Sequence, residues 1–133
     1  MSDNIFAFAQ ARATLRAELT ESWLVGGTLK VYSTPSPATS DTAIASQTLL
    51  ATFIFGDPAG TVANGVWTAE TIEPAMVAVS GTAVWARAFD STGAAIGDCD
   101  VGVPNSGAMI ELSAINLVEG AFVSVISFTL TEN

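Results

Sequence analysis

The sequence predicts a mainly β protein, a single antiparallel β-sandwich domain with an N-terminal α-helix. Apolar side chains recur at helical spacing only in residues 4–22, and residues 28–131 divide into about seven short β-branched and aromatic runs separated by turn residues. That number of short strands is typical of a sandwich. The 133 residues suffice for one hydrophobic core, and neither a linker nor an internal repeat divides them. We therefore expect residues 1–133 to form one domain.

Residues 4–22 are expected to form an amphipathic helix. Asp3 or Asn4 is a suitable N-cap, and Gly26–Gly27 is a suitable stop. A stripe of residues follows i, i+3 and i+4 spacing and continues to Trp23: Ile5, Phe8, Ala11, Leu15, Leu19 and Ser22. Polar side chains lie together on another face, as an amphipathic helix requires: Arg12, Arg16 and Thr20.

After Gly27 the spacing of apolar residues changes to the period of two that is typical of strands. Residues 28–33 alternate in this way and end before Pro35 and Pro37. Residues 33–47 are predicted to form a loop long enough to lie across a neighbouring molecule. Further strands are expected at 48–55, 66–72, 82–89, 95–101, 109–112 and 122–131. In the last of them the apolar residues of one parity are Phe122, Ile126, Phe128 and Leu130.

The composition indicates a protein that associates with itself or with other proteins. Half of the residues are hydrophobic and only 13% are charged, whereas about 25% are charged in a typical soluble domain. Charged side chains therefore cannot cover the whole surface. We expect some apolar surface to be buried against other copies or against partner proteins.

The charge balance argues against nucleic acids and membranes as partners. Thirteen acidic residues stand against four basic ones, which gives a net charge of −9. Binding to phosphates or to anionic lipids needs clustered Lys and Arg, and this chain lacks such clusters. No apolar run approaches the ~20 residues of a membrane span, and the N-terminus lacks the basic region of a signal peptide. With one cysteine and hence no internal disulfide, we expect a soluble protein made in the cytoplasm.

The stretch FDSTGAAIGDCD, residues 89–100, gathers three carboxylates and the only cysteine of the chain. Its DSTG string is similar to the Asp-Ser/Thr-Gly signature of aspartic proteases. The spacing is one residue too long, however, and no second copy exists to supply the other carboxylate of such a site. We therefore predict that Asp90 to Gly93 form a hairpin turn.

Asp98 and Asp100 are two residues apart, so on a strand their side chains point to the same face. They are either part of a site for a hard cation such as Ca²⁺, which takes 6–8 oxygen ligands, or a solvated face paired with Arg87. We favour the second interpretation, because a turn at residues 91–94 places Arg87 opposite Asp98. Such an exposed pair contributes ~0.2–1 kcal/mol. Cys99 points the other way, and we expect a packed thiol.

The residue types that most enzymes need are missing. The chain has no histidine, which removes Ser-His-Asp and Cys-His catalysis and most zinc sites, and no glycine-rich phosphate-binding loop is present. Asp57, Glu70 and Glu73 are too scattered for a glycosidase pair. The three tryptophans form a sugar platform or, as we expect, pack inside the protein: Trp23, Trp67 and Trp85. We predict no enzyme, no cofactor, and no catalytic or metal-binding residues.

Several short motifs resemble those of small structural proteins encoded in the morphogenesis regions of tailed bacteriophages and prophages. The similar segments are TLKVYS at 28–33, TLLAT at 48–52, GTAVWAR at 81–87, DSTG at 90–93 and VEGAFVSV at 118–125. The resemblance covers most of residues 5–131. It implies a virion component without catalytic residues, and none of its motifs distinguishes capsid from tail.

We therefore expect a phage virion structural protein that is made in the host cytoplasm. The favoured role is a capsid decoration or cement subunit that binds the major capsid protein and copies of itself. The N-terminal helix and residues 34–47 are the expected contact segments. The alternatives are a tail or head–tail connector component, and a carbohydrate- or cell-surface-binding module that uses Trp67 and Trp85 with an acidic Ca²⁺ site.

Overall fold

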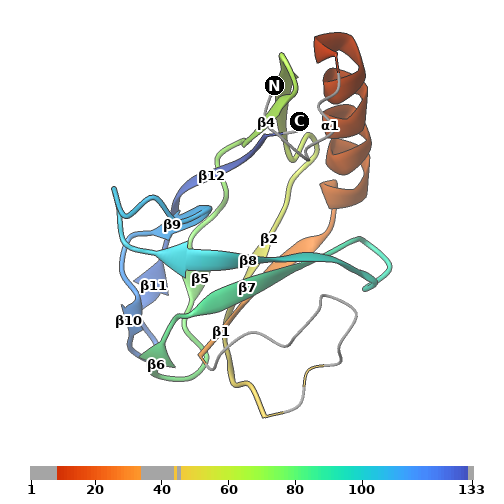
Figure 1. Ribbon diagram of the computed structural model, residues 1–133. Coiled ribbons are helices and arrows are strands. Elements are labelled where there is room, and N and C mark those ends of the chain that lie inside the picture. Colours follow the sequence, from red (N-terminus) through yellow and green to blue (C-terminus); the bar gives the residue numbers. More distant parts are fainter. Residues whose placement is uncertain (1–8, 34–43, 45, 132–133) are drawn as a thin grey trace.

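A computed structural model describes residues 9–33, 44 and 46–131 of the chain (Figure 1). The protein is mainly β with one N-terminal helix, as predicted. The elements in chain order are α1 (Gln10–Leu24), β1 (Thr28–Tyr32), β2 (Leu49–Ile54), β3 (Gly60–Ala63), β4 (Val66–Ala69), β5 (Ala75–Met76), β6 (Gly81–Thr82), β7 (Trp85–Phe89), β8 (Ala95–Gly102), β9 (Ile110–Leu112), β10 (Asn116–Leu117), β11 (Phe122–Val123) and β12 (Val125–Thr131).

Eight of these strands form one curled sheet in the order β2-β1-β7-β8-β9-β12-β4-β3. Two short ladders, β10–β6 and β11–β5, complete the described β structure. The sheet is mixed, because β8 and β9 run parallel where Val101 pairs with Ile110. The prediction of a purely antiparallel fold is therefore wrong at this pair, and a sandwich of two separate sheets is not confirmed.

The parallel pair depends on side chains that hold the connecting segment. The Glu111 carboxylate accepts hydrogen bonds from the Asn105 and Gly107 N–H groups at 3.1 and 3.2 Å. The Asp100 carboxylate accepts one from the Met109 N–H at 3.0 Å. These bonds fold residues 103–109 into a compact loop. The chain thereby re-enters the sheet beside the end of β8 and in the same direction.

The curled sheet encloses an aromatic centre. Phe55 follows β2, whereas Trp67 and Phe128 belong to β4 and β12 in the other half of the sheet. The ring centroids lie 6.4 Å apart for Phe55–Trp67, 6.2 Å for Phe55–Phe128 and 5.1 Å for Trp67–Phe128. All three side chains are buried, so the two halves of the sheet meet across these rings.

Helix α1 differs from the predicted one at both ends. It begins at Gln10, because Ala9 has the extended conformation of an N-cap residue (φ −55°, ψ 149°), and it ends at Leu24 rather than at residue 22. The predicted cap at Asp3 or Asn4 and the start at residue 4 lie outside the described residues. The glycine stop is confirmed, since Gly26 has a φ of +72° directly after the helix.

The apolar stripe of α1 faces away from the core, against the expectation for an amphipathic helix. The described residues that α1 buries are Ala13, Ala17 and Leu24. Leu15, Leu19 and Trp23 are instead 63%, 51% and 47% exposed.

Polar contacts on the inner side explain this orientation. Glu21 accepts hydrogen bonds from the Ala59 and Gly60 N–H groups at 3.0 and 2.8 Å, and from Trp67 Nε1 at 2.8 Å. The Thr14 hydroxyl oxygen accepts one from the Gly65 N–H at 2.9 Å. These bonds fix the inner face of α1 close to the β3–β4 backbone, where only small side chains fit.

The last predicted strand is interrupted. Residues 122–131 form β11 and β12, and the pairing of β12 with β9 shifts in register between Val125 and Ser127. Phe128 is buried as predicted, but Phe122 and Ile126 are exposed. The irregularity reverses the face to which the residues before it point.

Candidate functional site

A group of buried polar and aromatic side chains lies on the outer face of β1, β7 and β8. Leu29, Val31, Ala86 and Ala88 of these strands belong to the hydrophobic core, so the alternate residues point to the opposite face. Three residues on that face are buried: Tyr32, Trp85 and Arg87. Strand register brings them together, since Tyr32 pairs with Trp85 and Arg87 pairs with Asp98.

The Arg87 guanidinium binds the Asp98 carboxylate at two points. Arg87 Nε donates to Oδ1 at 2.6 Å and Nη2 donates to Oδ2 at 3.0 Å. The prediction that Arg87 lies opposite Asp98 is confirmed, but the pair is not exposed, because the Arg87 and Asp98 side chains are only 3% and 15% accessible. The charges of this site are therefore fixed and compensated within the protein.

Aromatic rings surround the ion pair. The Tyr32 and Trp85 rings stack at 4.7 Å with an interplanar angle of 19°, and the Arg87 guanidinium lies 5.3 Å from the Trp85 ring centroid. Burial, the largest cause, raises the pKa of Tyr32 above its usual value. Trp85 Nε1 is buried and has no hydrogen-bond partner in the described part of the chain. The cluster therefore offers a fixed shape and a compensated pair of charges.

The DSTG stretch forms the predicted turn between β7 and β8. Asp90 Oδ1 accepts hydrogen bonds from the Thr92 hydroxyl at 2.6 Å, the Thr92 N–H at 2.9 Å and the Ala94 N–H at 3.0 Å. The bond from the Thr92 hydroxyl is the largest of several that lower the pKa of Asp90. Gly93 supplies the positive φ of +90° that the turn needs. Asp90 is therefore an ionised turn residue.

Cys99 of β8 points toward the core, as predicted. Its side chain packs against the hydrophobic core, and Sγ lies 3.8 Å from the Ala86 carbonyl oxygen. Burial raises the pKa of the Cys99 thiol to about 12, with further contributions from Asp100 and Asp98. A thiol with such a pKa is protonated at neutral pH and is a poor nucleophile or metal ligand.

The tryptophan platform of the sugar-binding alternative is not available. Trp67 is fully buried and its Nε1 donates to Glu21. Trp85 is also buried, with the Arg87 guanidinium over its ring. Only Trp23 has an exposed ring, on α1. Packing, the default interpretation of the tryptophans, is therefore confirmed for Trp67 and Trp85 but not for Trp23.

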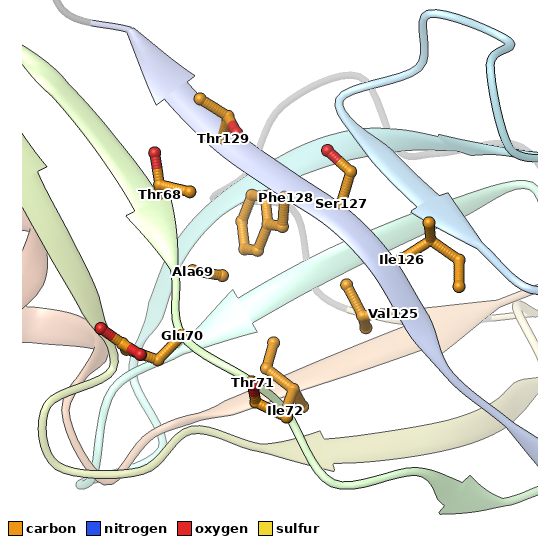
Figure 2. A pocket seen from close by; sticks show the side chains of 10 residues that line it. All are labelled: Thr68, Ala69, Glu70, Thr71, Ile72, Val125, Ile126, Ser127, Phe128 and Thr129. Atoms are coloured by element: carbon orange, nitrogen blue, oxygen red, sulfur yellow. The ribbon is translucent and has the colours of Figure 1, made fainter.

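A pocket of about 270 Å³ lies where β4 and β12 separate. The two strands pair only at Thr129–Thr131, and the chain that follows β4 then diverges from β12 (Figure 2). Ile72 and Phe128 contribute apolar surface, and the polar lining consists of Thr68, Glu70, Thr71, Ser127 and Thr129. Hydroxyl groups with one carboxylate can form hydrogen bonds to a ligand.

Large apolar side chains are exposed at several places in the described structure, including Ile54, Val118 and Ile126, and two groups of them share one helix face or one ladder. The first, here called the outer face of α1, consists of Leu15, Leu19 and Trp23. The second lies on the β5–β11 ladder, where Met76 pairs directly with Phe122 and the two side chains are 58% and 66% exposed. This second surface could not be predicted from the sequence, because strands of only two residues leave no periodic pattern.

The described residues were also compared with the requirements of a metal site and of a membrane-spanning helix. Within residues 9–33, 44 and 46–131, no group of three or more cysteine or acidic side chains is placed to hold a metal ion. No helix of that part of the chain is long and apolar enough to cross a membrane. No protein-family model, no curated protein and no solved structure matches this chain.

Proposed function

We propose that this chain is a structural subunit of a phage virion, and that it decorates the capsid by binding the major capsid protein and copies of itself. The observation that supports this role best is the exposure of large apolar side chains on two separate surfaces, the outer face of α1 and the Met76–Phe122 pair. A subunit that binds different neighbours needs more than one such surface. The motif resemblance to phage structural proteins supports a virion component but does not favour the capsid over the tail.

The energetics favour contacts in which several of these side chains become buried together. Full burial of one exposed Leu or Phe side chain contributes about 1.5–3 kcal/mol, and a half-exposed side chain contributes less. Association also costs translational and rotational freedom. A single apolar side chain is therefore insufficient, whereas a repeated lattice lets each subunit use both surfaces at once.

The two expected contact segments, the N-terminal helix and residues 34–47, differ in how much of each the structure describes. The described part of the N-terminal helix presents its outer face to the surroundings, as a contact element requires. Most of the loop at residues 34–47 lies outside the described residues, so its role remains a proposal from the sequence.

We also propose that the chain has no catalytic role. The Cys99 thiol is protonated at neutral pH, Asp90 Oδ1 is held by turn hydrogen bonds, and Asp98 is paired with Arg87. Each of these candidate groups thus has a structural partner or an unreactive form. The finer fold proposal, a two-layer sandwich, is supported by the contacts of Phe55 with Trp67 and Phe128 across the curled sheet.

Co-sedimentation with capsids tests the proposed role. Purified protein is mixed with expanded capsids of the phage or prophage that encodes it, and bound protein is measured against its input concentration. We expect saturable binding at a fixed number of copies per capsid. Met76→Ser with Phe122→Ser, and separately Leu19→Ser, identify the surface that contacts the capsid. Absence of binding, together with a monomer at high protein concentration, contradicts the proposal.

A further inference from the structure

We propose that the outer face of α1 binds the same face of a second copy, with the two helices antiparallel and Arg12 of each copy in a pocket beside Trp23 of the other. This names the surface and symmetry of the self-association in the proposed function. It does not depend on the presence of a capsid.

The inner face of α1 is already occupied and its position is fixed. Glu21 and Thr14 hold it to the backbone of Ala59, Gly60 and Gly65, and Ala13 and Ala17 are buried there. The helix cannot rotate to bury its large apolar side chains without breaking these bonds. Leu15, Leu19 and Trp23 therefore stay exposed in an isolated subunit and need a partner to be buried.

The spacing on the outer face is self-complementary in an antiparallel pair. When two such helices cross midway between Leu15 and Leu19, Leu15 of each copy packs against Leu19 of the other. Arg12 is exposed and lies seven residues before Leu19, so it belongs to the edge of the outer face and not to a separate polar face. The same register places Arg12 of each copy beside Trp23 of the other. In a parallel pair, Arg12 of one copy lies next to Arg12 of the other, and two like charges in direct opposition are unfavourable. The charge pattern thus selects the antiparallel arrangement.

A shallow pocket beside Trp23 has the chemistry to receive the arginine. Trp23, Asp90, Ala95 and Ile96 line it, and its volume is about 170 Å³. A cation above an aromatic ring gains about 0.5–1 kcal/mol at an exposed site, and a carboxylate adds a hydrogen-bond acceptor. The hydrogen bonds from the Thr92 hydroxyl and from the Thr92 and Ala94 N–H groups all end on Asp90 Oδ1. An entering guanidinium can therefore bind Oδ2 without opening the turn.

The dimensions indicate a weak and concentration-dependent dimer. The helix has 15 residues and is roughly 22 Å long at about 1.5 Å per residue. A pair of such helices buries less surface than a permanent dimer, which needs well over ~1,000 Å². A capsid lattice, by contrast, raises the local concentration of subunits and makes such a contact effective.

The first experiment measures the mass of the full chain by sedimentation equilibrium across a wide range of protein concentrations. We expect a monomer–dimer equilibrium whose dissociation constant rises at least tenfold in Arg12→Gln and at least tenfold in Leu19→Ser. Phe122→Ser is the matched control, because Phe122 is as exposed as Leu15 but lies on the other apolar surface. Circular dichroism confirms that each variant is folded.

The second experiment tests the orientation of the two helices by disulfide cross-linking in a Cys99→Ala background. Leu15→Cys and Leu19→Cys are prepared separately and oxidised alone or mixed. A disulfide forms only when the two Cα atoms lie within about 7 Å of each other. The antiparallel register places position 15 of one copy next to position 19 of the other. We therefore expect the mixture to form the disulfide between these two positions faster than either variant links to itself. A wild-type protein that stays monomeric overturns the proposal. The proposal is also overturned if the protein still dimerises in Arg12→Gln and Leu19→Ser, or if Phe122→Ser abolishes the dimer. Cross-linking in which each cysteine variant links mainly to itself overturns it as well. Each of these outcomes leaves capsid binding through the Met76–Phe122 surface open to its own test.

Discussion

Arg87 and Asp98 form a two-point ion pair between neighbouring strands, and only 3% of the Arg87 side chain is accessible to solvent. The pair joins β7 to β8 on the outer face of the sheet, next to the stacked rings of Tyr32 and Trp85. Because both charges are largely removed from water, each depends on the other for compensation. The pair therefore contributes to the rigidity of the sheet.

Removing one partner of this pair is expected to be costly. Asp98→Asn removes the carboxylate charge that binds the buried Arg87 guanidinium at two points, and we expect the free energy of unfolding to fall by about 3 kcal/mol. Arg87→Met combined with Asp98→Leu is expected to be more stable than Asp98→Asn, since it leaves no buried charge uncompensated. Urea denaturation measures both. Equal stability of Asp98→Asn and the wild type contradicts the importance of the pair.

Glu21 is predicted to hold α1 on the β3–β4 hairpin. Glu21→Ala leaves the Ala59 and Gly60 N–H groups and Trp67 Nε1 without their acceptor, and we expect a loss of about 2–3 kcal/mol in the free energy of unfolding. Glu18→Ala, an exposed position on the same helix, is the control and should change stability by less than ~0.5 kcal/mol. If both variants unfold alike, the helix is not held by Glu21.

Two glycine positions provide a further comparison. A Cβ at Gly60 lies against the Thr68 carbonyl oxygen and 2.5 Å from Trp67 Cε2, whereas a Cβ at Gly97 meets nothing within 4 Å. We expect Gly60→Ala to destabilise the protein by about 1–3 kcal/mol through overpacking. Gly97→Ala should leave stability unchanged or raise it by up to ~1 kcal/mol. Thermal unfolding distinguishes the two, and a tolerated Gly60→Ala argues against the close contact.

The Cys99 thiol gives a pH-dependent prediction. Its pKa in the folded protein is raised to about 12, above the ~8.5 of an unfolded cysteine, so the folded state retains a proton that the unfolded state loses. The stabilisation is complete below about pH 8.5 and is lost as the pH rises toward 12. The wild type should therefore lose stability over that range more steeply than Cys99→Ala. At pH 8, folded protein should react with iodoacetamide much more slowly than urea-unfolded protein.

The turn of the β7–β8 hairpin could be predicted because turn chemistry is local. Arg87 does lie opposite Asp98, but a register shift between Ala88 and Phe89, which the sequence does not reveal, produces that pairing. The burial of that pair could not be predicted, because it depends on neighbours far away in the sequence, such as β1, which pairs with β7.

The orientation of α1 and the parallel β8–β9 pair could not be predicted for the same kind of reason. Helical spacing shows that Leu15, Leu19 and Trp23 share a face, but not whether that face or the opposite one meets the sheet. Glu21 decides this through contacts with residues of the β3–β4 hairpin. The parallel pair likewise depends on hydrogen bonds from Asp100 and Glu111 to loop N–H groups, which no periodic pattern records.

Immunogold labelling of virions tests the central claim most directly. An antibody raised against the purified protein is applied to intact particles of the encoding phage or induced prophage, and the positions of the gold particles are counted. The account predicts label distributed over the capsid surface and absent from particles of a deletion mutant. Label confined to the tail or to the head–tail junction, or intact virions without any label, contradicts the assignment of this chain as a capsid decoration subunit.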